Sequence, residues 1–352
     1  MAAAGPPLVR ALAEGPLVTG GARQGNGRLS DGNPLRLVRY ADRPPLALEP
    51  HRVGKHAGYY VETRSFTTCF SAFKRELDDI EMIRDRGHLV FVHGMQGTGK
   101  TSLICRCAHF LKELAGPVEL RVIDERSLTG SVRTPQRRML GLVFKICWEL
   151  MQSRHFSENR SRLDRLQSVI VEVSRLKEQE GLTAERAKAE AAAVLSEIGL
   201  GSDGDEPLVM VLLPRSTSLQ DVRFYADVVQ PCMLFFAELE DEDADQEHPP
   251  FDGNISVVPL RPRPLSVEDG WEFVRRRLYQ KTDCRESLNI REDHIKAIMT
   301  AYDGRMTIRL LVDGLVEIFE QIIRADSPRD VSYSDLASQF ILAPPSEETG
   351  SS

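Results

Sequence analysis

The stretch that decides the fold of this chain is Gly94-Met95-Gln96-Gly97-Thr98-Gly99-Lys100-Thr101, which matches the pattern G-x-x-x-x-G-K-[ST] at every fixed position. The apolar run 88–93 before it is typical of a buried strand, and residues 102–111 after it form a predicted helix. Glycines let successive backbone N–H groups turn toward an anion, and the positive end of the helix strengthens the attraction. Strand, glycine-rich turn and helix in this order predict a loop that binds the phosphates of a nucleoside triphosphate.

Individual residues of this phosphate loop have different expected roles. Lys100 can reach the outer phosphates, and the Thr101 hydroxyl is placed to bind Mg²⁺. We expect the nucleotide to contact the whole stretch from Gly94 to Ser102. The sequence has no Asn-Lys-x-Asp motif for guanine, so ATP with Mg²⁺ is the expected ligand. A glycine-rich turn without a ligand is the structural alternative, and the complete motif between a strand and a helix favours the nucleotide.

Strands and helices alternate along the middle of the chain. Further strands are predicted at 118–124, 208–213, 233–239 and 255–260. Helices are predicted at 70–83, 140–151 and 221–229, and two more in the charged, Ala-rich interval 160–198. This alternation predicts an α/β fold, a P-loop NTPase parallel sheet flanked by helices.

The sequence after Pro264 contains only helical patterns, at 267–278, 291–302, 306–323 and 333–341. This change predicts a C-terminal all-helical lid domain. The beginning of the chain is rich in Gly, Pro, Arg and Ala without sustained periodicity, which is typical of a flexible leader. The expected division is a leader at 1–55, an α/β core at 56–262, a lid at 263–342 and a disordered tail at 343–352.

The composition of the 352 residues excludes several classes of protein. The net charge of −7 excludes a globally basic nucleic-acid binder. The six cysteines lack zinc-ligand spacing, so we expect buried, reduced thiols. The N-terminus lacks the pattern of a secretory signal, and no apolar stretch approaches the roughly 20 residues that cross a bilayer. A cytoplasmic protein without a membrane segment is expected.

Hydrolysis of a bound nucleotide needs a carboxylate at the tip of a strand beside the loop. The predicted strand 208–213 ends in Pro214-Arg215 instead. The strand 233–239 contains Glu238, which is therefore the first candidate for the metal-binding and catalytic carboxylate. Asp124 and Glu125, at the end of the strand 118–124, are the reserve candidates. The alternative is that these acids only face solvent at strand ends.

Four segments give the chain a family resemblance. They are the lead-in 73–77, the phosphate loop, the junction 259–269 (Pro-Leu-Arg-Pro-Arg-Pro-Leu-Ser-Val-Glu-Asp) and the segment 303–311 (Asp-Gly-Arg-Met-Thr-Ile-Arg-Leu-Leu). Together they resemble the AAA+ and STAND class of P-loop ATPases, nearest the subgroup of origin-recognition and replication-initiator ATPases. The resemblance covers residues 70–341.

This resemblance implies roles for particular residues. Arg309 corresponds to the sensor 2 arginine that faces the γ-phosphate from the lid, with Arg305 as second choice, so the implied catalytic set is Lys100, Glu238 and Arg309. The strand 208–213 corresponds to the Walker B strand, in degenerate form, and the strand 233–239 is implied to lie between it and the strand before the loop. Ring-forming members place an arginine finger where this chain has the acidic run 241–247, which argues against a closed hydrolysing ring.

Three functions follow as hypotheses. The first is a nucleotide-driven conformational ATPase, which converts ATP and water to ADP and phosphate and acts on a protein or nucleic-acid partner. The second is a non-hydrolysing nucleotide-sensing pseudo-ATPase or scaffold, and the third, a P-loop kinase, is disfavoured by the lid. A protein partner would bind the leader, the acidic loop or the helices at 160–198. The basic runs 133–138 and 275–277 are the candidates for nucleic acid.

Overall fold

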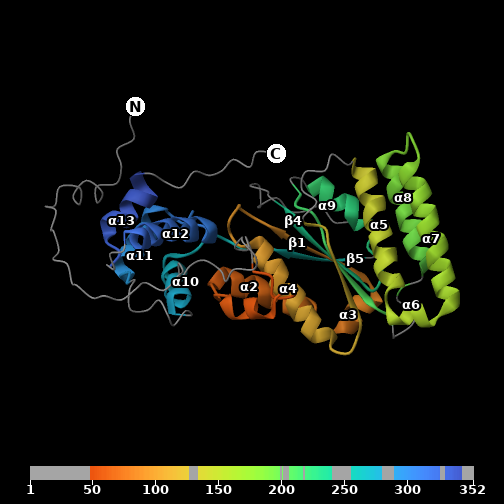
Figure 1. Cartoon of the computed structure of the whole chain (residues 1–352), viewed down its shortest axis with the longest axis horizontal. Coiled ribbons are helices and arrows are strands. Elements are labelled where there is room, and N and C mark those ends of the chain that lie inside the picture. Colours follow the sequence, from red (N-terminus) through yellow and green to blue (C-terminus); the bar gives the residue numbers. More distant parts are fainter. Residues whose placement is uncertain are drawn as a thin grey trace.

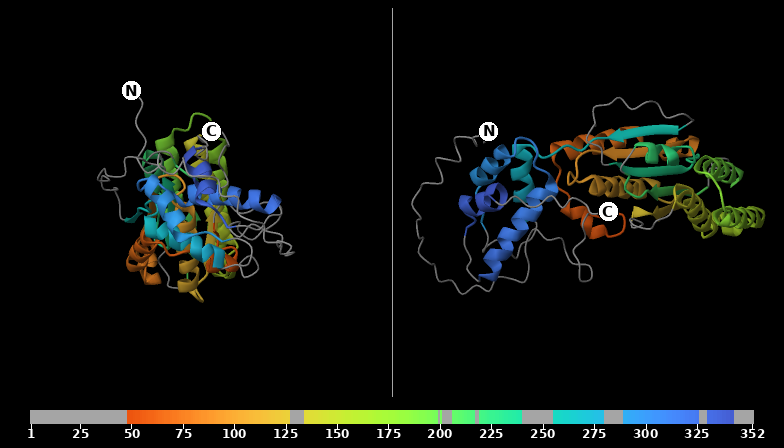
Figure 2. Two further views of the ribbon diagram at one scale, coloured as in Figure 1. Left: turned by 90° about the vertical axis from the view of Figure 1, so that its left-hand side faces the viewer. Right: turned by 90° about the horizontal axis from the view of Figure 1, so that it is seen from above.

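The computed structural model describes residues 48–126, 134–198, 200, 206–216, 219–239, 255–279, 289–325 and 330–342. Three parts follow one another along the long axis of the molecule (Figure 1): the helical lid, an α/β core and a second helical unit. The view from above in Figure 2 shows the same order. The predicted leader up to residue 47, the tail and most of the acidic loop lie outside the described residues.

The core is built on a parallel sheet. Within the described residues its five strands lie in the order β2-β3-β4-β1-β5, and every pairing is parallel. The strands are β1 (Gly87–His93), β2 (Leu120–Asp124), β3 (Leu208–Leu212), β4 (Met233–Leu239) and β5 (Ile255–Leu260). The predicted α/β class is confirmed, and β4 lies between β1 and β3 as the resemblance implies. This order brings the ends of β3 and β4 next to the phosphate loop that follows β1.

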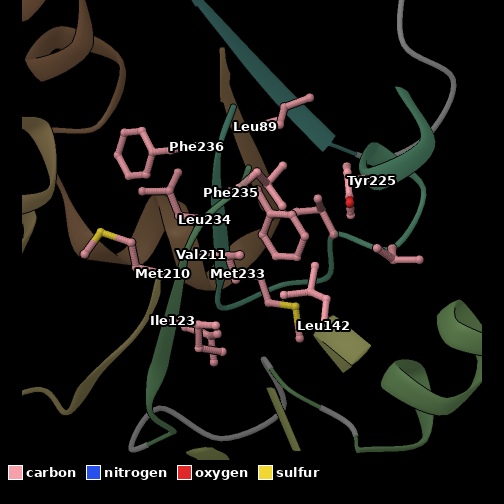
Figure 3. Packing of buried hydrophobic residues seen from close by; sticks show 14 of the residues in the cluster. Leu89, Ile123, Leu142, Met210, Val211, Tyr225, Met233, Leu234, Phe235 and Phe236 are labelled. Carbon is pink, nitrogen blue, oxygen red and sulfur yellow. The ribbon is translucent and has the colours of Figure 1, made fainter. Parts of the chain in front are cut away.

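The central strands form because their residues are apolar on both faces. Every residue of β1, β3 and β4 is buried, as expected for a parallel sheet with helices on both sides. Figure 3 shows that Phe235 lies on the side of Leu142 and Tyr225, whereas its neighbour Phe236 points the other way. Successive side chains of a strand point to opposite faces, so β4 contributes to two layers of the core.

Helices cover both faces of this sheet. In Figure 1, α2, α3 and α4 lie below the sheet and α9 lies above it. The helices of the core are the short 3₁₀ helix Gly54–Tyr59, α2 (Arg64–Glu76), α3 (Ile80–Asp85), α4 (Lys100–Ala115) and α9 (Leu219–Ala226). The single helix predicted for 70–83 is wrong: the chain leaves α2 at Leu77, and the Asp79 carboxylate caps a new helix by accepting from the N–H of Glu81.

The second helical unit lies beyond β2. It comprises α5 (Pro135–Met151), α6 (Arg154–Glu158), α7 (Arg160–Glu178) and α8 (Ala184–Ile198). The helices α7 and α8 are the two that the sequence predicts within 160–198. The helix α5 begins at a proline, whose fixed φ suits the first helical position. The fully buried carboxylate of Glu206 accepts a 2.6 Å bond from Arg162 and so ties α7 to the chain that enters β3.

The lid has a hydrophobic core of its own. Its helices are α10 (Val267–Tyr279), α11 (Glu292–Ala301), α12 (Ile308–Arg324), α13 (Tyr333–Ala337) and the π-helical turn Ser338–Leu342. Phe319, Met299 and Phe340 are buried in this second core. A capping box between Ser332 and Asp335 starts α13. None of the helices in the described part of the chain is long and apolar enough to span a membrane.

Two glycines inside helices allow a test of this packing. A Cβ on Gly314 of α12 would lie 2.3 Å from the Phe340 ring, whereas a Cβ on Gly141 of α5 meets nothing within 4 Å. Gly314→Ala should destabilise the protein by about 1–3 kcal/mol through overpacking. Gly141→Ala should stabilise it by about 0.5–1 kcal/mol through helix propensity. Equal effects of the two substitutions in chemical denaturation would contradict the packing of α12 against Phe340.

Candidate functional site

The phosphate loop joins β1 to α4 in an anion-binding conformation. Gly94, Gly97 and Gly99 have φ values of 143°, 80° and 92°, which only glycine adopts easily. The buried Lys100 side chain folds back over the loop, and its Nζ donates to the carbonyl oxygens of Gly94 at 2.6 Å and Met95 at 3.0 Å. The loop is therefore closed on its own lysine, which has the length and charge to transfer these bonds to a phosphate.

The lid contacts the loop directly through the start of α12. The backbone N–H of Arg309 donates to the carbonyl oxygen of Gly97 at 3.0 Å. A Cβ added to Gly97 would lie 2.7 Å from the Thr307 hydroxyl, and one added to Gly99 would lie 3.2 Å from Ile308 Cδ1. The glycines thus serve a second purpose, because they leave room for the lid at the loop.

The Arg309 side chain itself makes a different contact. Its Nε lies 3.4 Å from the Asp313 carboxylate one turn along α12, and both side chains are exposed. The structure brings the predicted sensor segment to the loop through its backbone. The expected role of the guanidinium at a γ-phosphate stays a prediction.

Glu238 lies against the loop, as the strand order requires. The Thr101 hydroxyl donates to Glu238 Oε2 at 2.5 Å. The Glu238 side chain is 6% exposed, and the Arg215 Nε lies 3.3 Å from its other oxygen, Oε1. A second nitrogen of the same guanidinium, Nη2, lies 3.4 Å from the Thr101 hydroxyl oxygen. Thr101, Glu238 and Arg215 therefore form one polar cluster at the end of β3 and β4.

The reserve acids make their contacts away from this cluster. Asp124 pairs with Arg126 at 2.5 Å and with Arg52 at 2.7 Å, and these bonds lower the pKa of its carboxyl despite partial burial. Glu125 pairs with Lys145 of α5 and lines a cavity of about 220 Å³. Since both acids have other partners, Glu238 is the carboxylate that the fold brings to the loop.

A segment before α2 lies along the helix that follows the loop. The Tyr60 hydroxyl donates to the carbonyl oxygen of Ser102 at 2.7 Å, and the N–H of Leu48 donates to the Ser102 hydroxyl at 3.3 Å. Val61 is buried in the hydrophobic core of the lid, and the N–H of Arg64, the first residue of α2, donates to Asp269 of the lid at 2.9 Å. Residues 48–55, which the sequence assigns to the leader, thus belong to the packed structure, and the segment contacts both the core and the lid.

The arginine run 275–277 is engaged within the lid. Arg275 and Arg276 both pair with Glu272, at 2.8 Å and 2.5 Å. The Arg277 guanidinium lies 5.5 Å from the ring centroid of Phe273, and burial lowers the pKa of Arg277 to about 10. These contacts weaken the run as a surface for nucleic acid. Arg133 of the other basic run lies outside the described residues.

Arg215 is the site residue that sequence reasoning did not assign. The sequence shows it only as a departure from the acid expected at the end of β3. In the structure the pairing of Ser216 N–H with the Glu238 carbonyl, at 2.9 Å, continues beyond the strand and holds Arg215 beside Glu238. The strand order was the available signal, since it places the end of β3 next to that of β4.

Comparisons with known proteins find distant structural similarity. No protein-family model and no curated protein sequence matches the chain. Similar solved structures include Aeropyrum pernix ORC1 in complex with DNA, at 12% identity, covering 82% of this chain and 69% of that one with a TM-score of 0.49. Drosophila ORC bound to DNA shares 12% identity over 88% of this chain and 70% of that one, with a TM-score of 0.45. Cdc6p from Pyrobaculum aerophilum shares 13% identity over 78% and 67%, with a TM-score of 0.44.

The fold itself rests on the geometry described above. A loop after β1, a parallel sheet with β4 between β1 and β3, and a helical lid on the loop make the predicted P-loop NTPase fold with a C-terminal lid. The identities are too low to transfer an activity. Function is therefore argued from the residues at the loop.

A buried histidine in the segment before α2, His51, should make the stability of the protein depend on pH. Burial and then the charges of Arg126 and Arg52 lower the pKa of His51 from 6.5 to about 4. Between these values the unfolded chain binds a proton that the folded chain does not, so stability is full at pH 7 and falls as the pH drops from about 6.5 to about 4. The loss from His51 should reach about 3 kcal/mol, since one pKa unit corresponds to about 1.4 kcal/mol.

Chemical denaturation at pH 7, 5.5 and 4.5 measures this effect in wild type and His51→Asn. The variant should lose less stability between pH 7 and 4.5 than wild type. It should keep part of the dependence, because burial also lowers the pKa of His56 and His88. If stability falls equally with pH in the two proteins, His51 is not a neutral, buried side chain in the folded protein.

Proposed function

We propose that this chain binds ATP at the phosphate loop and uses it to control the position of the lid. The observation that carries the proposal is the complete loop between β1 and α4, with Lys100 folded over it and the start of α12 packed on it. A triphosphate would displace the Lys100 ammonium from the carbonyls of Gly94 and Met95. The loop N–H groups and the positive end of α4 would hold the phosphates.

We propose hydrolysis as the reaction at this site. Water would attack the γ-phosphorus and the bond to the ADP oxygen would break. Glu238 is the carboxylate that would orient and deprotonate that water, because it is bonded to Thr101 beside the loop. Arg309 would exchange its exposed contact with Asp313 for the γ-phosphate. Loss of that phosphate would then weaken the contact between lid and loop.

The same cluster decides how well Mg²⁺ fits. Thr101 and Glu238 supply two oxygens of the kind that Mg²⁺ prefers, and phosphates and water would complete its shell. When bound, the ion would neutralise charge on the phosphates. The described residues contain no group of three or more His, Cys, Asp or Glu that could hold a metal by themselves. The two oxygens fit the ion, and the Arg215 guanidinium already contacts both of them.

That contact favours the second candidate function, a nucleotide sensor with negligible turnover. A carboxylate that already contacts a guanidinium and a hydroxyl has fewer lone pairs left to orient water. In this case ATP would fix the lid against the loop without being consumed. The two candidates share the binding site and differ only in whether Glu238 becomes available.

A protein partner is the proposal that agrees best with the charges. The chain is acidic overall, and the arginines of the run 275–277 are bound within the lid. The DNA in the Aeropyrum and Drosophila structures belongs to those proteins. DNA binding by this chain is a separate proposal, and a salt-dependent affinity would support it.

Isothermal titration with ATP and a phosphate-release assay test the two candidates. Wild type should bind ATP, and Lys100→Ala should bind it at least about tenfold more weakly through the loss of a charged hydrogen bond. Glu238→Gln should still bind ATP and release no phosphate above background. Lys296→Ala and Glu158→Gln, which remove exposed charges elsewhere, are the matched controls.

The outcomes separate the hypotheses. Wild type that binds ATP without turnover would establish the sensor and exclude hydrolysis. Turnover that survives Glu238→Gln would contradict the role of that carboxylate. If neither wild type nor the controls bind ATP, the proposed function is wrong.

A further inference from the structure

The guanidinium of Arg215 occupies a place where an ATP-binding loop of this type ordinarily depends on a metal ion. The Thr101 hydroxyl is the protein ligand that the loop offers to Mg²⁺, and a strand-end acid is expected beside it. Here Arg215, three residues after the end of β3, is a cation, and it contacts the Thr101 hydroxyl and the Glu238 carboxylate together, at 3.4 Å and 3.3 Å. A Mg²⁺ bound to these oxygens would lie close to this guanidinium, and the two positive charges would repel each other.

The backbone holds Arg215 in this place. The N–H of Leu213 donates to the carbonyl of Phe236 at 2.8 Å, and that of Ser216 donates to the carbonyl of Glu238 at 2.9 Å. Arg215 lies between these two bonds, so its Cα is fixed next to β4. Its side chain is 47% exposed, whereas that of Glu238 is 6% exposed. The carboxylate is therefore rigid and enclosed, and the guanidinium reaches it from the solvent side.

Two cationic side chains at the loop favour a ligand with negative charge. Arg215 lies beside the Thr101 hydroxyl and Glu238, and the Lys100 ammonium lies over the loop at the carbonyl of Gly94. A guanidinium has five N–H donors in a planar fork and can bond a carboxylate and a phosphate at the same time. At the Thr101 hydroxyl, such donors lie beside the position of the outer phosphates.

We infer that Arg215 replaces Mg²⁺ as the counter-charge of the bound triphosphate, so that nucleotide binding is largely independent of divalent metal. This inference rests on the proposed function and identifies Arg215 as its specificity-determining residue. Arg215 and Mg²⁺ would neutralise charge at the same place, beside Thr101 and Glu238. The half-exposed guanidinium can move toward solvent when the ion enters.

Titration of a fluorescent ATP analogue (mant-ATP) into the full chain, in EDTA and in Mg²⁺, tests the inference. Wild-type affinity should differ by less than about threefold between the two buffers. Arg215→Ala should bind about tenfold or more weakly than wild type in EDTA, because a charged hydrogen bond to phosphate is lost, and should regain affinity with Mg²⁺. Arg215→Lys, which keeps the charge and loses the fork, should lie between them in EDTA.

Two controls keep the result interpretable. Arg324→Ala removes an exposed positive charge at the far end of α12 and should leave both affinities unchanged. Thermal unfolding of each variant without nucleotide detects any loss of folding, and Arg215→Lys is the variant to use if Arg215→Ala is unstable.

The remaining outcomes overturn the inference in distinct ways. If wild type binds in Mg²⁺ and loses more than about tenfold in affinity in EDTA, the proposed function stands. Arg215 is then not the counter-charge of the triphosphate. If Arg215→Ala has the same affinities as wild type, the contact of Arg215 with Glu238 is only a structural ion pair, and the inference is wrong. Absence of binding by wild type in both buffers would overturn the proposed function and the inference with it.

Discussion

The phosphate loop is crowded by the lid and by the junction after β5, and this crowding constrains the rest of the structure. Its glycines must hold φ values that side chains disfavour, and a Cβ on Gly97 would lie 2.7 Å from the Thr307 hydroxyl of the lid. A Cβ on Gly94 would lie 3.0 Å from the carbonyl oxygen of Pro262, in the junction after β5. Loop, junction and lid therefore meet at contact distance. A ligand that moves the loop must also move the lid or be accommodated by it.

Strand order turns this loop into a site. Because β4 lies between β1 and β3, Glu238 near the end of β4 and Arg215 just after β3 both reach Thr101, which follows the loop after β1. In a parallel sheet, ligands bind beyond the carboxyl ends of the strands, where loops from separate parts of the chain converge. Here that convergence brings together a base and a cation. The same geometry that makes Glu238 the candidate carboxylate also pairs it with Arg215.

The segment before α2 extends the site toward the N-terminus. Its backbone and Tyr60 bond to Ser102 at the start of α4, while Arg64 bonds to Asp269 of the lid. The partly buried pair of Arg126 with Glu49 and the pair of Asp124 with Arg52 attach the segment to the end of β2. Core and lid are thus connected by the junction after β5 and also by this segment. A change in lid position would therefore affect the contacts of both connections.

The sequence by itself determined the phosphate loop, the class of sheet and the helical lid, because each depends on a local pattern. Glycine spacing, apolar runs and helical periodicity act over a few residues and need no distant partner. It also pointed to Glu238 through a family strand order that the sheet confirmed. It did not place residues 48–55 on the core, since their contacts with Ser102 and Arg126 join positions far apart in the chain. Only the tertiary structure gave Arg215 its partners, because the pairing of Ser216 with Glu238 brings together two strand ends that the chain separates by a helix.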